Sequence, residues 1–348
     1  MRNVVYTLIF LFVLLILFKG IILEAIDSLG FDISINKSVL FSKDGGVTWQ
    51  DYKSSFLANN DLIFDKNNIE KFLLASNVGV LNIKIEETSQ KEKAYKKDRK
   101  ANNLWKIFQS DEQPNTIYGL SYQLDGDEVL LSKNYGKYFK KVFKVNKNDR
   151  ISAFCFNFNN VFLGTKNGNL IGSNDGGESW YKIKEFSPQA ILAMGCSKSN
   201  EVFIVLSSKV VNLFSPEIPQ KIDSKVLVFK NEGFFEIEKL RGEKIKSIKI
   251  HPLTNEVYFV SDEKIYLYHR GGTGYINPPS DFKITAFTID EKNPNIIYIG
   301  GRGILYKSKN NGKTWEIIDL PQKVQGKKIT EIEINPNDSN LILIKISD

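Results

Sequence analysis

Residues 42–49 read SKDGGVTW, and closely similar stretches recur along the chain. SNDGGESW at residues 173–180 and SKNNGKTW at residues 308–315 share the pattern S-x-[DN]-x-G-x-[ST]-W, while SKNYGKYF at residues 132–139 ends in Phe. Weaker copies at residues 88–95 (TSQKEKAY), 229–235 (FKNEGFF) and 268–275 (YHRGGTGY) fill the gaps. The seven starts lie about 44 residues apart on average, the period of a four-stranded propeller blade.

Each of these boxes joins two short apolar runs, so we expect it to form the turn of a β-hairpin. The Asp or Asn can accept backbone N–H bonds across the turn, the Gly supplies a positive φ, and the hydroxyl side chains bond locally. The Trp then begins the next strand and buries its ring. Since no box pairs a nucleophile with a base, we interpret the boxes as structural and expect no catalytic residue. The box positions are Ser42, Asp44, Gly46, Thr48, Trp49, Ser132, Asn134, Gly136, Ser173, Asp175, Gly177, Ser179, Trp180, Ser308, Asn310, Gly312, Thr314 and Trp315.

Polar turns rich in Pro and Asn, such as EKNPN at residues 291–295, lead into most of the apolar strands. The predicted order in each blade is strand A, polar turn, strand B, strand C, box and strand D. Only one strand precedes the first box, whereas residues 329–346 supply strands A and B with no box behind them. We therefore predict an all-β, seven-bladed β-propeller over residues 27–348, closed by pairing of residues 329–346 with residues 35–52.

With these repeats the sequence resembles the Asp-box (BNR repeat) β-propellers over about nine-tenths of its length. That superfamily includes sialidases, some β-glucan hydrolases, sortilin-type receptors and the photosystem II stability/assembly factors, so the fold alone does not decide the function. In size and single-domain form the chain is most similar to the assembly-factor-like bacterial proteins. This resemblance implies a non-catalytic, protein-binding scaffold or assembly factor with no cofactor.

The N-terminus carries a long apolar segment. Residues 4–18 (VVYTLIFLFVLLILF) hold no charge, and extension through residue 23 reaches the roughly 20 residues that span a bilayer. No small-x-small cleavage site is clear, so we predict an uncleaved signal-anchor, a transmembrane helix within residues 1–26. The propeller would then be membrane-anchored and extracytoplasmic, or secreted if the segment is cleaved.

The formal net charge is +7, and the basic residues are mostly Lys, which argues against nucleic acid as a partner. In a propeller, the D–A and B–C connections share one face, and the anchor is expected to leave from it. We predict that basic residues in the D–A connections make this face a site for anionic lipid or an acidic membrane-protein loop, with solvated surface lysines as the alternative. These residues are Lys96, Lys97, Arg99, Lys100, Lys140, Lys141, Lys144, Lys147, Arg150, Lys323, Lys327 and Lys328.

The sequence gives little support for an enzymatic function. A sialidase needs an arginine triad and a Tyr–Glu pair, and the early Arg-Ile-Pro-type motif of those families is absent. The β-glucan hydrolases set two carboxylates across a cleft, normally between two propellers, and this chain has one. A glycan-binding or sialidase-like surface protein stays as the alternative. Two cysteines, Cys155 and Cys196, are read as unpaired core residues, and two histidines cannot build a three-His site, so no metal is expected.

Overall fold

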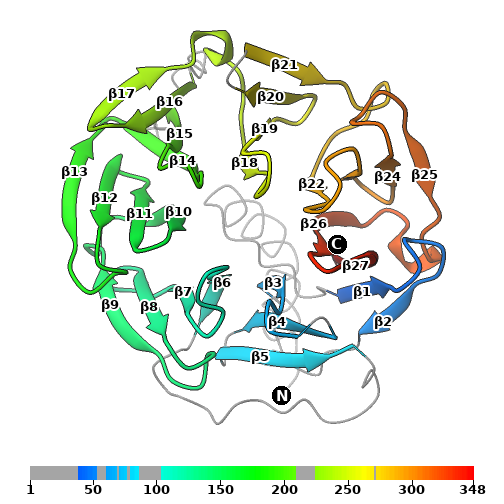
Figure 1. Cartoon of the computed structure of the whole chain (residues 1–348), viewed down its shortest axis with the longest axis horizontal. Coiled ribbons are helices and arrows are strands. Elements are labelled where there is room, and N and C mark those ends of the chain that lie inside the picture. Colours follow the sequence, from blue (N-terminus) through cyan, green and yellow to red (C-terminus); the bar gives the residue numbers. More distant parts are fainter. Residues whose placement is uncertain are drawn as a thin grey trace, which may run out of the picture.

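The computed structural model describes residues 38–52, 60–68, 70–76, 79–85, 103–208, 224–269 and 272–348. Within them, seven antiparallel sheets stand around a central axis, which confirms the predicted all-β, seven-bladed propeller (Figure 1). The predicted transmembrane helix at residues 1–26 lies outside the described residues. No helix within those ranges is long and apolar enough to cross a membrane.

We number the blades in chain order, and in each blade the first strand is innermost. Blade 1 combines both ends of the described chain, with the sheet order β26–β27–β1–β2. Blade 2 comprises β3–β5, blade 3 β6–β9, blade 4 β10–β13, blade 5 β14–β17, blade 6 β18–β21 and blade 7 β22–β25. The strands are β1 (Ser38–Ser42), β2 (Gln50–Tyr52), β3 (Asp61–Phe64), β4 (Lys71–Ser76), β5 (Gly79–Lys84), β6 (Leu104–Gln109), β7 (Ile117–Ser121), β8 (Glu128–Ser132), β9 (Lys140–Lys144), β10 (Ile151–Asn157), β11 (Asn160–Thr165), β12 (Asn169–Ser173), β13 (Tyr181–Glu185), β14 (Gln189–Cys196), β15 (Val202–Ser208), β16 (Lys225–Lys230), β17 (Gly233–Glu236), β18 (Ser247–Ile250), β19 (Val257–Val260), β20 (Ile265–His269), β21 (Gly272–Ile276), β22 (Ala286–Ile289), β23 (Ile297–Gly300), β24 (Leu305–Ser308), β25 (Glu316–Ile318), β26 (Lys328–Asn335) and β27 (Asp338–Ser347). Two 3₁₀ turns, η1 (Glu238–Leu240) and η2 (Gln322–Val324), precede β18 and β26.

The ring closes within blade 1. Strand β27 runs antiparallel to β1 with Leu40 opposite Ile344, and β1 pairs on its other side with β2. The C-terminal strands therefore lie between the blade 7 strands and the first described strand (Figure 1). Because both edges of β1 are paired, the closure leaves no free sheet edge at that strand.

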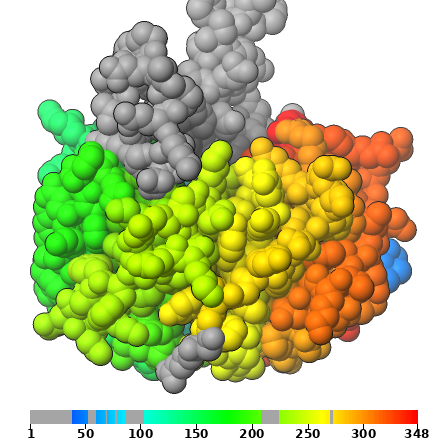
Figure 2. All heavy atoms as spheres, turned by 90° about the horizontal axis from the view of Figure 1, so that it is seen from above, coloured from blue at the N-terminus to red at the C-terminus, as the bar shows by residue number. Residues whose placement is uncertain are grey.

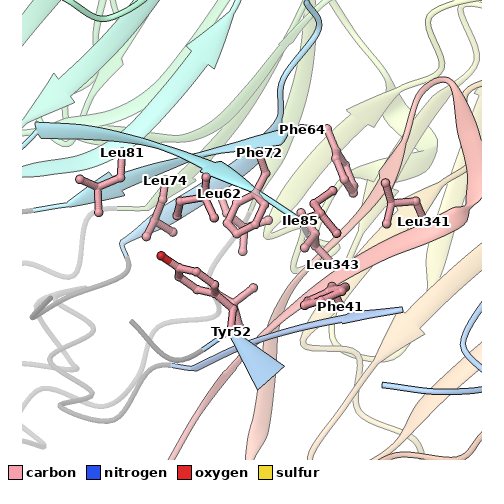
Figure 3. Close-up of a cluster of buried hydrophobic side chains, with 12 residues drawn as sticks. Phe41, Tyr52, Leu62, Phe64, Phe72, Leu74, Leu81, Ile85, Leu341 and Leu343 are labelled. Carbon is pink, nitrogen blue, oxygen red and sulfur yellow. The ribbon is translucent and has the colours of Figure 1, made fainter. Parts of the chain in front are cut away.

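Apolar side chains pack between neighbouring blades. The described residues form seven buried clusters, and each cluster takes its residues from two adjacent blades. Figure 3 shows the cluster between blades 1 and 2, where Phe41 and Leu343 meet Phe64 and Phe72. In the edge-on view of Figure 2, blades 5, 6 and 7 stand side by side around the rim. Burial of apolar surface between blades is thus what holds the ring together.

Polar side chains tie neighbouring inner strands to one another. Side chains near the start of inner strands donate to a carbonyl of the next inner strand: Asn60 Nδ2 to Leu104 O (2.6 Å), Ser152 Oγ to Ile191 O (2.5 Å) and Thr285 Oγ1 to Ile329 O (2.6 Å). The inner strands of blades 1, 3, 4 and 5 each carry a register irregularity beside this point. A bulge turns the carbonyl out of its own sheet, where the neighbouring blade can bind it.

The four strong boxes share one turn structure. The hydroxyl of Ser42 donates to Asp44 Oδ1 (2.7 Å) and accepts from Gly46 N (2.8 Å), while Asp44 Oδ1 accepts from Thr48 N (2.8 Å). The same three bonds recur around Ser132, Ser173 and Ser308. Gly46 has a φ of 100°, in the region that Gly adopts without strain.

The box tryptophans lie between blades. Trp49 packs against the cluster between blades 7 and 1, and Trp180 against the cluster between blades 3 and 4. Their indole N–H groups donate to the carbonyls of Gly46 and Gly177, whereas that of Trp315 donates to Asn277 of the preceding blade.

Two sequence expectations need correction. The weak box at residues 229–235 is a two-residue hairpin: Lys230 pairs with Gly233, and the intervening Asn231 and Glu232 both have positive φ. Cys155 and Cys196, expected to be unpaired, form a disulfide between the inner strands β10 and β14. Their separation of 41 residues is close to one blade period, so they occupy matching places in adjacent blades, with Cα atoms 5.5 Å apart.

Candidate functional site

The predicted basic face is largely neutralised in the structure. Lys140, Lys141 and Lys144 lie on the outer strand β9, not in a D–A connection as predicted. Carboxylates face most of the described members of the set, as in Lys140–Glu178 (2.8 Å), Lys141–Glu128 (3.2 Å), Lys144–Asp125 (2.5 Å), Arg150–Asp127 (2.9 Å), Lys323–Asp51 (2.5 Å) and Lys327–Asp348 (2.9 Å).

The remaining members of the set divide in two. Lys147 and Lys328 are exposed, while Lys96, Lys97, Arg99 and Lys100 lie outside the described residues. Six of the eight described members of the set thus face a carboxylate.

Charged side chains instead gather on the inner strands, near the D–A end of the axial channel. Asp61 on β3 is buried and accepts from the Ile107 backbone N–H (2.9 Å) and from Lys106 Nζ (3.1 Å). Lys345 on β27 is also buried and contacts Glu331 of β26 (2.6 Å) and the Asn60 carbonyl (2.9 Å). The Asp61–Lys106 ion pair thus joins blades 2 and 3, and the bond from Lys345 to the Asn60 carbonyl joins blade 1 to blade 2.

These neighbours shift the ionisation of the two carboxyl groups in opposite directions. Burial raises the pKa of Asp61 to about 7, although Lys106 opposes the rise. Burial alone would raise the pKa of Glu331, but the positive charges of Lys345 and Lys106 outweigh this effect and lower the pKa to about 2. Glu331 is therefore ionised at neutral pH, whereas Asp61 titrates close to neutrality.

A second group of charges lies further along the channel, toward the face that carries the A–B turns. Lys249 of blade 6 reaches Glu333 of blade 1 (3.6 Å), and Lys66 of blade 2 contacts Asp111 of blade 3. Burial lowers the pKa of Lys66 and raises the pKa of Glu333. Each of these two lysines thus faces a carboxylate of another blade, so positive and negative charges are matched here.

The channel ends on the A–B face in a cavity of about 140 Å³ built by five successive blades. Its lining takes residues from the turns and strand ends of blades 2 to 6, namely Lys66, Gln109, Asp111, Glu112, Phe156, Asn157, Cys196, Lys198, Ile250, Pro252 and Asn255. Leu253, next to the lining Pro252, is 69% exposed. The mouth therefore combines apolar side chains with positively charged lysines and negatively charged carboxylates.

Buried polar side chains hold the turns around this mouth in place. His251 is fully buried; its Nδ1 accepts from the backbone N–H of Thr254 (3.1 Å), which leaves Nε2 to donate to Asp290 O (3.1 Å). Gln109 bonds across blades to Asp65 and to the Lys66 backbone. The described residues contain no group of three or more His, Cys, Asp or Glu side chains that could hold a metal ion.

Sequence reasoning missed both the axial charges and the mouth. The charged residues alternate with apolar ones along β26 (KITEIEIN), which reads like any half-exposed strand. A usable signal is that strand A of a propeller faces the axis. Polar residues that alternate with apolar ones along strand A therefore point toward the axis, whereas on an outer strand they would point into bulk solvent.

Comparisons with known proteins add the fold only. No protein-family model and no curated protein sequence matches this chain. Among solved structures, the GH74 enzyme of Niastella koreensis is 13% identical with a TM-score of 0.62, over 83% of this chain and 51% of that chain. The GH74 xyloglucanase from Xanthomonas campestris is 14% identical with a TM-score of 0.62, over 90% of this chain and 52% of that chain. This chain thus spans about half the length of these enzymes.

A third similar structure is of comparable length. YCF48 bound to a D1 peptide is 14% identical to this chain, with a TM-score of 0.55, over 83% of this chain and 93% of that chain. At these identities the likeness shows a shared propeller fold. The neighbours include both GH74 enzymes and a propeller solved with a bound peptide, so they leave the function to be argued from the site.

Proposed function

We propose that this chain is a non-catalytic, membrane-anchored propeller outside the cytoplasm, and that it binds a segment of another envelope protein at its axial mouth. The cavity lined by five blades carries the proposal, because its lining sets the apolar side chains of Phe156, Ile250 and Pro252 beside lysines and carboxylates. Leu253, which follows Pro252, is 69% exposed at the same turn. An apolar anchor surrounded by polar groups is typical of protein-recognition surfaces. A propeller of similar length, YCF48, has been solved with a bound peptide.

The topology supports an orientation with this mouth away from the membrane. β1 is strand C of its blade and begins at Ser38, opposite Ile346 near the end of β27. Strand C begins on the face with the B–C and D–A connections, so a segment preceding residue 38 joins the ring there. An apolar anchor at residues 4–18 would place that face, with its exposed Leu124 and Lys147, next to the bilayer.

The disulfide supports a location outside the cytoplasm. Cys155 and Cys196 join two inner strands of the ring, and Cys196 also lines the mouth. Structural disulfides persist in oxidising compartments and are rare in the reducing cytosol. The bridge therefore agrees with export of the propeller by the apolar N-terminal segment.

The state of the axial carboxylates supports a role without catalysis. Asp61 is held by a lysine and a backbone N–H, and Glu331 by Lys345. Glycoside hydrolysis needs one carboxyl group free to protonate the leaving oxygen and a second free to attack or to activate water. Here Asp61 is buried against Lys106 and the Ile107 N–H, and Glu331 is buried against Lys345, so neither carboxyl group is open to a substrate.

Site-specific photo-crosslinking in intact membranes tests the proposal. A photoreactive residue placed at Asn255, in the mouth, should yield one discrete cross-linked protein, and Leu253→Asp in the same chain should abolish that product. A photoreactive residue at Leu124, on the opposite face, is the control and should react with lipid. Equal cross-linking of the same protein from Leu124, or a product that survives Leu253→Asp, would refute the assigned face.

A further inference from the structure

In the A–B turn between β10 and β11, an aromatic residue occupies a left-handed backbone position. Asn157 pairs with Asn160, so Phe158 and Asn159 alone form the hairpin loop. Phe158 has a φ of 52°, in the left-handed region where Gly, Asn and Asp are favoured and a bulky aromatic side chain is an outlier. Backbone strain of this kind persists where the side chain is needed for something other than folding.

The Phe158 ring is not used to build the core. Its side chain is 57% exposed, whereas Phe154 and Phe156 on the preceding strand pack in the cluster between blades 3 and 4. An exposed aromatic ring alone is unremarkable on a protein surface. An exposed ring that is held in a disfavoured backbone conformation, beside a cavity, is a candidate ligand contact.

A cleft of about 330 Å³ adjoins this ring, between blades 3 and 4 on the A–B face. Phe158 supplies exposed aromatic surface and the buried Tyr118 lies at the cleft, while the polar lining includes Gln113, Thr116, Lys133 and Asn159. Gln113, Lys133 and Asn159 are exposed, so amide and ammonium donors and acceptors reach solvent beside the ring. This volume is at the lower end of the range for small-ligand pockets.

The charged side chains that line the cleft already have partners within the protein. Lys133 contacts Glu178 (2.9 Å), and Asp175 is occupied by its own box, where it accepts from Ser173 and Ser179. Glu112 lines both this cleft and the axial mouth, and it accepts from Ser110 (3.3 Å). The lining thus holds two carboxylates and one lysine that is already paired, so the cleft disfavours an anionic ligand and is compatible with a neutral one.

The backbone around the cleft is also already paired. Gly176 N donates to Asn159 O (2.8 Å), Tyr135 N to Asn115 O (2.8 Å), and the Tyr118 hydroxyl to Gly176 O (3.0 Å). An extended peptide gains affinity mainly through main-chain hydrogen bonds to an open edge, and these turns offer few. A sugar instead binds through side-chain amides and hydroxyls, and it packs the C–H face of its ring on an aromatic side chain.

From this geometry we propose a second binding site, in which the Phe158 cleft takes one or two residues of a neutral oligosaccharide. The sugar ring stacks on Phe158, and its hydroxyls bond to the Gln113 and Asn159 amides. This site goes beyond the protein-binding role proposed above. It depends on Phe158, whereas the protein site depends on Leu253, so either proposal can fail while the other holds.

Saturation-transfer NMR and calorimetry on the full-length protein test the site with four neutral probes: cellopentaose, xylopentaose, mannopentaose and chitopentaose. At least one probe should bind, and Phe158→Asn should weaken that binding at least about tenfold. Asn is at ease in the left-handed region, so this variant should keep or raise the melting temperature. Loss of binding with a folded, equally stable protein separates a ligand contact from a structural role.

Phe158→Trp and Leu253→Asp are the matched controls, and both should keep affinity for the same probe within about threefold. Absence of binding by all four probes would overturn the proposal, as would unchanged binding by Phe158→Asn. If Phe158→Asn instead removes the protein cross-link formed at Asn255 while no sugar binds, Phe158 belongs to the protein site and the sugar proposal is wrong.

Discussion

Removal of the Lys345 ammonium group should destabilise the ring far more than removal of a surface lysine. The Lys345 and Glu331 side chains are 7% and 15% exposed, and Lys345 contacts both Glu331 and the Asn60 carbonyl. Lys345→Met leaves the Glu331 carboxylate buried with Lys106 as its remaining neighbouring cation. Breaking a buried pair in this way costs about 3–5 kcal/mol.

The cost should appear as a fall in melting temperature of about 4–7 °C at pH 7, followed by scanning calorimetry on the full-length protein in detergent. Lys182→Met is the matched control: the Lys182 and Glu185 side chains are 52% and 53% exposed, so its loss should cost below about 0.5 kcal/mol. The double variant Lys345→Met/Glu331→Leu should recover most of the stability, because it removes both charges. Equal effects of Lys345→Met and Lys182→Met, or a double variant no better than the single one, would refute this account of the inner charges.

Three further predictions follow from the described contacts. Burial raises the pKa of Asp61 from 3.8 to about 7, so its protonated form stabilises the fold at low pH, and this contribution is lost as the pH rises toward 7. The melting temperature of the wild type should therefore fall relative to that of Asp61→Asn between about pH 4 and pH 7. Reduction of the disulfide, or the double variant Cys155→Ser/Cys196→Ser, should cost about 2–4 kcal/mol in denaturant unfolding, and an unchanged midpoint would count against the bridge. Ser42→Ala removes the buried acceptor of Gly46 N and should cost about 1–3 kcal/mol in the same assay, while a loss below about 0.3 kcal/mol would contradict the structural role of the box.

Local, repeated features were accessible from the sequence. The spacing of the boxes predicts seven blades, because each box is a turn built by residues within eight positions of one another. The order of strands, polar turns and boxes follows from the alternation of apolar runs and turn residues. Each of these signals consists of a few neighbouring residues with characteristic side chains, so it can be recognised in a single sequence.

The contacts that join distant parts of the chain were not accessible in this way. Lys345 bonds to the Asn60 carbonyl 285 positions away, and each residue alone looks like part of an ordinary polar pattern. Lys140 and Lys141 were assigned to a connection because a run of lysines reads as solvent-exposed chain, yet an outer strand is equally exposed. The disulfide was missed because two cysteines carry no pairing information without the blade register that sets them side by side.

The orientation of the propeller relative to the membrane depends on closure of the ring between β1 and β27. Hydrogen–deuterium exchange of the full-length protein measures this closure directly, strand by strand. The account predicts that backbone amides of β1 (Ser38–Ser42) exchange as slowly as those of the equivalent strand β12 (Asn169–Ser173), since both lie between two paired strands. Exchange of the β1 amides at the rate of unpaired chain, with β12 protected, would contradict it.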